Sequence, residues 1–151
     1  MNICVDAGFL IALYDSADEH HVLATRLFGQ LFEGVPHRFV VPWPILYETV
    51  STRLTRRRES IAMLQRDLKL LRSANRLMLL HDRKLREQAL EQCFGELERP
   101  GGNYRNLSLV DRVVRQMLLN RRLRLHAFIT FNPRDFADVC THQRVNLISH
   151  I

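Results

Sequence analysis

The chain has 151 residues, of which 46% are apolar, 25% charged and 8% aromatic. This composition is typical of one soluble globular domain, here expected over residues 1–151, and it excludes disordered, collagen-like and low-complexity proteins. The formal net charge is +6, and every basic residue except Lys69 and Lys84 is an arginine. Guanidinium groups bind phosphate oxygens in pairs, so the bias suits a polyanionic partner, although a genomic preference for arginine would produce it too.

Short apolar runs rich in β-forming residues alternate with segments whose apolar residues recur at helical spacing. Gly34 and Pro36 suit the end of one helix, and Pro44 suits the first turn of another. In chain order the pattern predicts a strand at residues 2–5, a helix after Asp6, a helix at 21–33, a strand at 38–41, helices at 45–54 and 59–72, a strand at 75–80, a helix at 82–98, a loop at 100–103, a helix at 107–121, and strands at 127–131 and 145–148.

The alternation of strands and helices indicates the fold class. The predicted strands are apolar on both faces, which is typical of a parallel sheet covered by helices on both sides. We therefore expect a three-layer α/β/α domain with a roughly five-stranded parallel sheet. In open sheets of this kind, ligands bind beyond the carboxyl ends of the strands.

Four acidic residues are expected at that edge. Asp6 follows the first strand, Glu48 lies one turn into the helix after the second, Asp111 opens the helix before the fourth, and Asp135 follows the fourth. Residues 1–52 carry a net charge of −4, whereas residues 53–76 carry +6 and residues 77–151 carry +4. Clustered carboxylates repel one another unless cations neutralise them, and their hard oxygen ligands suit Mg²⁺ or Mn²⁺.

Each acid also has a simpler explanation. Asp6 is a suitable N-cap, Ser108 and Asp111 fit a capping box, and Asn132 with Pro133 and Asp135 suits the start of a helix. Glu48 lies on the polar side of its helix and could simply be solvated. Only the joint placement of the four acids predicts a metal site.

Four segments resemble the motifs of PIN domains, the nuclease fold that includes the VapC toxins of toxin–antitoxin pairs. They span nearly the whole chain in the same order, and the joint match is more specific than any one motif. The segments are CVDAGFLIALYD at residues 4–15, VPWPILYETV at 41–50, LSLVD at 107–111 and ITFNPRDF at 129–136.

The resemblance implies a metal-dependent endoribonuclease whose acidic pocket consists of Asp6, Glu48, Asp111 and Asp135. It further implies one or two Mg²⁺ or Mn²⁺ ions, with support from Ser108 and Thr130. Many family members have an acid where this chain has Asn132, so either Asp135 supplies the fourth ligand or three acids and water hold the metal.

Arginines near these acids are candidates for contacts with RNA phosphates. Arg53 and Arg56 follow the Glu48 helix, and Arg112 and Arg115 share a helix with Asp111. A solvated arginine face explains them as well. The preference for RNA over DNA comes from the resemblance alone.

The partners and the location are further expectations. The resemblance implies an RNA substrate, a small antitoxin protein and a homodimer. Phe28, Leu31 and Phe32 either face such a partner or belong to the core. The three cysteines are widely spaced, and no apolar run approaches the ~20 residues of a membrane helix, so we expect a cytoplasmic protein without disulfides. Two alternatives stay open: a stand-alone PIN nuclease in RNA processing, and a catalytically weak module that binds RNA or protein.

Overall fold

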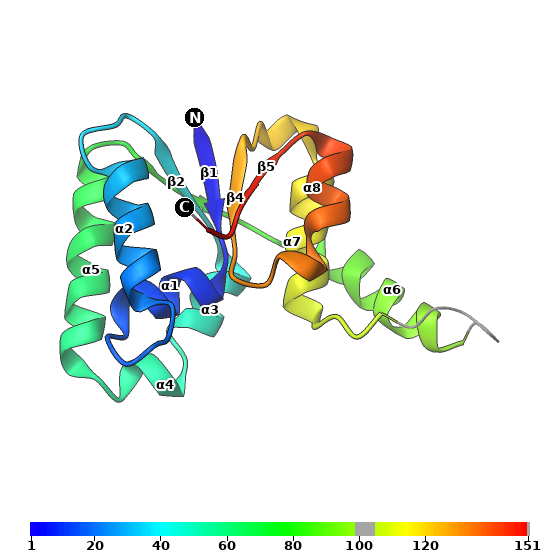
Figure 1. Ribbon diagram of the computed structural model, residues 1–151. Helices are drawn as coiled ribbons and strands as arrows, with labels where there is room; N and C mark the ends of the chain where they lie inside the picture. The colour runs from blue at the N-terminus through cyan, green and yellow to red at the C-terminus, as the bar shows by residue number, and fades with distance from the viewer. Residues whose placement is uncertain (99–104, 151) are drawn as a thin grey trace.

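The computed structural model describes residues 1–98 and 105–150. A five-stranded sheet lies between two layers of helices (Figure 1), and every pair of neighbouring strands is parallel. The three-layer α/β/α prediction is confirmed. The strands run in the order β3-β2-β1-β4-β5 and comprise β1 (Asn2–Val5), β2 (Arg38–Pro42), β3 (Leu77–Leu80), β4 (Ala127–Ile129) and β5 (Asn146–Ile148).

The central strand β1 is apolar on both faces because helices cover both sides of the sheet. Ile3, Cys4 and Val5 are fully buried. Cys4 pairs with Val40 of β2 on one side and with Phe128 of β4 on the other. Strand β1 therefore joins the two halves of the sheet, and its carboxyl end opens at the middle of the edge.

The helices divide between the two faces of the sheet (Figure 1), with α1, α2 and α5 on one side and α6, α7 and α8 on the other. None that the structure describes is long and apolar enough to cross a bilayer. Their bounds are α1 (Ala7–Tyr14), α2 (His21–Phe32), α3 (Trp43–Thr49), α4 (Thr52–Thr55), α5 (Arg58–Ser73), α6 (Arg86–Leu97), α7 (Leu109–Leu119) and α8 (Ala137–Gln143), with short 3-10 helices η1 (Arg121–Leu123) and η2 (Pro133–Asp135).

The prediction of a single helix over residues 45–54 is wrong. The chain forms α3 and α4 instead, with an extended backbone at Ser51 between them. β-branched residues and serine are poor helix formers, because hydroxyl groups compete for backbone carbonyls. Here the buried Thr49 hydroxyl donates to the Ile45 carbonyl at 2.7 Å, and Thr55 donates to the Ser51 carbonyl at 3.0 Å.

The other elements match their predictions except at their ends. Gly34 follows α2 with a φ of 70°, a backbone conformation that glycine adopts without strain. Phe32 is buried, and Phe28 and Leu31 pack against the core, so these three residues belong to the core. The loop predicted at residues 100–103 lies outside the described residues.

Candidate active site

Asp6 lies where β1 passes into α1, at the carboxyl edge of the sheet. Its Oδ1 accepts a hydrogen bond from the backbone N–H of Ala7 at 2.8 Å, so it caps α1 as the sequence allowed. Its Oδ2 accepts a hydrogen bond from the buried Thr130 hydroxyl at 2.8 Å, and Thr130 follows β4. Asp6 therefore serves both as the N-cap of α1 and as a candidate site residue. The ends of two neighbouring strands, β1 and β4, position its carboxylate.

Asp111 is held at the start of α7 by Ser108. The backbone N–H of Ser108 donates to Oδ2 of Asp111 at 3.0 Å, and the Ser108 hydroxyl donates to the same oxygen at 2.7 Å. In return, the backbone N–H of Asp111 donates to the Ser108 hydroxyl oxygen at 3.0 Å. The predicted capping box is therefore formed, and it fixes the position of the Asp111 carboxylate.

Asp135 ends η2, the turn that follows β4. The Asn132 side-chain amide donates to Oδ2 of Asp135, and the backbone N–H of Asn132 donates to the Thr130 hydroxyl oxygen at 3.0 Å. Arg115 of α7 also donates to the backbone carbonyl of Asp135. Asn132 thus orients Asp135 at the position where many PIN domains have a further acid.

Glu48 belongs to the exposed side of α3. Nearby charge affects both it and Asp6. Burial raises the pKa of Asp6, and Asp111 and Asp135 raise it further. Partial burial likewise raises the pKa of Glu48, and the negative charges of Asp6 and Asp111 raise it further. The four acids that the sequence singled out therefore act on one another as one electrostatic group.

No basic side chain of the described residues forms an ion pair with an acid of this group. Within residues 1–98 and 105–150, the ion pairs shorter than 4.0 Å do not include Asp6, Glu48, Asp111 or Asp135. Neighbouring carboxylates without a counter-ion are costly unless a cation joins them.

The donor set fits a hard divalent cation, because all four side chains offer carboxylate oxygens. The arrangement is open, however, since no three acidic, histidine or cysteine side chains of the described chain are grouped tightly enough to hold an ion. Asp111 and Asp135 are instead hydrogen bonded to Ser108 and Asn132. The pocket has the chemistry of a metal site without a closed coordination shell.

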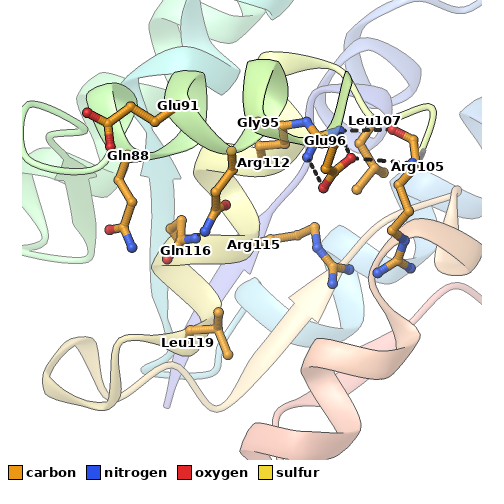
Figure 2. Close-up of a pocket in the computed structure, with 11 residues that line it drawn as sticks. Gln88, Glu91, Gly95, Glu96, Arg105, Leu107, Arg112, Arg115, Gln116 and Leu119 are labelled. Atoms are coloured by element: carbon orange, nitrogen blue, oxygen red, sulfur yellow. Dashed lines mark hydrogen bonds and ion pairs between the residues drawn. The ribbon is translucent and has the colours of Figure 1, made fainter. Parts of the chain in front are cut away.

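The arginines predicted to contact RNA differ in their surroundings. Arg53 pairs with Asp15 at 3.0 Å and with Asp18 at 2.9 Å, whereas the exposed Arg56 makes no ion pair with a described residue. Arg112 is only 4% exposed and forms two hydrogen bonds of 2.8 Å with Glu96 (Figure 2). Its guanidinium is therefore not available to a phosphate group in this conformation.

Figure 2 shows the cavity of about 610 Å³ between α6 and α7 that Arg112 helps to line. Arg115 and Arg105 extend from it toward a common acceptor, Asp138 of α8. Arg115 makes two hydrogen bonds of 2.7 Å with Asp138, and Arg105 makes one of 2.8 Å. This cluster joins the segment before α7, α7 itself and α8.

Sequence reasoning missed Asp138, Arg105 and Arg134. Asp138 is three residues beyond Asp135, and Arg134 directly precedes Asp135, but neither spacing identifies a role. Arg105 approaches them only through the fold, because it binds Asp138 across 33 residues of chain. A pair formed between distant segments leaves no local pattern that could have revealed it.

Comparison with known proteins supports the motif resemblance. No protein-family model matches the sequence, and no curated protein matches it significantly. Among solved structures, the chain is similar to VapC20 of Mycobacterium tuberculosis, which is described as a toxin that cleaves the sarcin–ricin loop. The TM-score is 0.63 and the identity is 26%, over 90% of this chain and 94% of that chain. The resemblance to PIN-domain proteins of the VapC type, first indicated by the motifs, is thus confirmed by the similarity in fold.

Proposed function

We propose that the protein is a metal-dependent endoribonuclease and the toxin of a toxin–antitoxin pair. The observation that carries the proposal is the group of four carboxylates at the carboxyl edge of the sheet, none of which forms an ion pair with a described residue, on a fold similar to that of an RNA-cleaving toxin. Asp6, Glu48, Asp111 and Asp135 would hold one or two Mg²⁺ or Mn²⁺ ions. A bound ion of this kind would supply a water of lowered pKa and neutralise charge on a phosphodiester.

The residues of the chain have separate tasks in this proposal. Asp6 anchors the pocket, because Ala7 and Thr130 fix both of its oxygens. Ser108 and Asn132 orient Asp111 and Asp135. Either Glu48, whose pKa is raised by partial burial, or Asp111 would orient the attacking water or accept a proton from it. In-line attack on phosphorus would leave a 5′-phosphate and a 3′-hydroxyl.

The proposed RNA contacts favour exposed arginines. Arg56 has no ion-pair partner among the described residues, and Arg53 keeps about half of its side chain exposed while it binds Asp15 and Asp18. Both follow α3, which carries Glu48. Arg115 and Arg112 are held by Asp138 and Glu96, so we assign them to the support of the site.

Cleavage of a mixed RNA pool tests the proposal. The wild-type protein should cut RNA with Mg²⁺ or Mn²⁺ and not with excess chelator, and mapped fragments should carry 5′-phosphates. Asp6→Asn should abolish cleavage. Arg26→Gln changes a charge on α2, on the other face of the sheet from α7 and α8, and should leave cleavage unchanged (Figure 1).

Other results would point elsewhere. Equal cleavage by Asp6→Asn and wild type would contradict the assigned pocket. RNA binding without cleavage in either metal would favour a binding module. A toxin should arrest growth when it is expressed alone and not when it is co-expressed with a small protein encoded beside it; growth without arrest would favour a stand-alone nuclease. The homodimer and the cytoplasmic location, which the resemblance also implies, are tested by light scattering and cell fractionation.

A further inference from the structure

A second cavity adjoins the acidic group and has the opposite chemistry. Its volume is about 650 Å³, and Asp135 forms part of its wall, so it borders the candidate active site at that residue. The other described residues that line it are Arg105, Asn106, Leu107, Asn132 and Arg134. Four of these five carry side-chain N–H donors, whereas the active site presents carboxylate oxygens.

The donors of this cavity are largely unused. Arg134 is exposed and makes no ion pair or side-chain hydrogen bond with any described residue. Arg105 uses one N–H group to bind Asp138, and its remaining side-chain N–H groups donate to no described residue. A guanidinium carries five N–H donors, so most of those on the two arginines are free to donate hydrogen bonds to a ligand.

Charge also favours an anion in this cavity. Asp138 binds Arg105 and Arg115 together, so one carboxylate faces two guanidinium groups. Arg134 adds a further positive charge, and Asp135 is the only acid that lines the wall among the described residues. An RNA strand is repelled by the four carboxylates of the active site, and an adjacent cationic wall offsets that repulsion.

From these observations we infer that the cavity binds a backbone phosphate next to the one that is cleaved, with Arg134 and Arg105 as the donors. This inference rests on the proposed function and extends it to the path of the RNA strand. The Arg134 side chain can change its conformation to reach the phosphate, because no described residue binds it. Asp138 binds Arg105 and so positions it for the same phosphate. The two arginines are positioning residues, since they act on a phosphate that does not react.

The test measures binding and cleavage separately. A single-stranded RNA oligonucleotide is titrated by fluorescence anisotropy against Asp6→Asn protein, with and without the added change Arg134→Gln, at several salt concentrations. The expected result is an affinity loss of about tenfold and a decrease of about one unit in the salt slope. Arg134→Lys keeps the charge and should restore the slope, and the matched control Arg26→Gln should change neither quantity.

A chemically altered substrate identifies the phosphate. Once a cut site is mapped, RNA substrates are made in which one phosphate beside that site at a time is replaced by an uncharged methylphosphonate. The cleavage of these substrates is measured with the active protein. One replacement should raise KM for the wild type, with little change in kcat, and should have no further effect on Arg134→Gln.

The outcomes separate the inference from the function. If Asp6→Asn is inactive and Arg134→Gln binds RNA as tightly as Arg26→Gln does, the inference is wrong and the nuclease function stands. If no RNA is cleaved, the anisotropy titration still decides whether the cavity binds a phosphate.

Discussion

The hydroxyl of Thr130 donates to Oδ2 of Asp6 at 2.8 Å, and its oxygen accepts the backbone N–H of Asn132 at 3.0 Å. Through one buried side chain, the anchor of the pocket is connected to the turn that carries Asp135. The hydrogen bond from Thr130 lowers the pKa of Asp6 and so opposes the effect of burial. Thr130 therefore affects both the position and the pKa of the Asp6 carboxylate.

Thr130→Val should impair cleavage more than it impairs folding. The valine has a similar shape but leaves Oδ2 of Asp6 and the Asn132 N–H without their hydrogen bonds to Thr130, which should cost about 1–3 kcal/mol of unfolding free energy. Loss of a group that orients a metal ligand typically lowers activity about 10- to 100-fold. Urea unfolding and RNA cleavage measure the two effects. Thr141→Val on α8 removes a hydroxyl that donates to the Ala137 carbonyl at 2.8 Å, and it should leave cleavage intact.

Asp6→Asn should unfold at the same or a higher temperature than the wild type in metal-free buffer at pH 7. The pKa of Asp6 is raised in the folded state, so this carboxyl group destabilises the folded state once the pH rises above its ordinary value of 3.8, and asparagine removes that effect. Added Mn²⁺ should reverse the order: an ion present at 100 times its Kd raises the unfolding free energy of the wild type by about 2.7 kcal/mol. Differential scanning fluorimetry in both buffers checks this. An equal Mn²⁺ shift in the variant would show that the ion binds elsewhere.

Glu96→Gln should lower the unfolding free energy strongly, by about 3 kcal/mol, because it leaves the buried Arg112 without its opposite charge. Arg112 lowers the pKa of Glu96, first through its hydrogen bond, so glutamate is the charged partner at neutral pH. Glu91→Gln changes an exposed residue of the same helix and should be nearly neutral. Chemical denaturation of both variants measures the difference, and equal midpoints would mean that the ion pair contributes little.

The stabilising effect of Asp15 should depend on pH. The backbone N–H of Ala17 lowers the pKa of Asp15, and Arg53 and Arg57 lower it further, against the effect of burial. A lowered folded pKa stabilises the protein above the ordinary value of 3.8 and ceases to do so as the pH falls through the folded value. Asp15→Asn should therefore cost about 1–2 kcal/mol at pH 7 and progressively less below about pH 4. A cost that does not vary with pH would contradict this account.

The sequence predicts the sheet well, and it predicts that Asp6, Asp111 and Asp135 lie at the ends of elements, because both depend on local patterns. Apolar runs locate the strands, and each of Asp6, Asp111 and Asp135 lies at the end of an element, where a capping residue is also recognisable. The break between α3 and α4 was also marked locally, by Thr49, Val50 and Ser51, but the helical spacing of apolar residues outweighed that signal.

The partners of the arginines could not be predicted in the same way. Arg112 and Arg115 are three residues apart on α7, yet the first is buried against Glu96 and the second is turned toward Asp138. These directions depend on how α6 and α8 pack on either side of α7, and that packing joins segments that are 16 and 23 residues apart. Charge identified the residues without indicating which of them reach solvent.

The central position of β1 has a consequence for synthesis of the protein. Asp6 is synthesised before Thr130, which holds it and lies 124 positions later, and β4 must pair with β1 to bring the two together. A growing or truncated chain that lacks residues 127–135 has neither the second neighbour of β1 nor Asp135. Such a fragment lacks Thr130 and Asp135, so we expect the group of four carboxylates to form only after β4 and the turn that follows it have been synthesised.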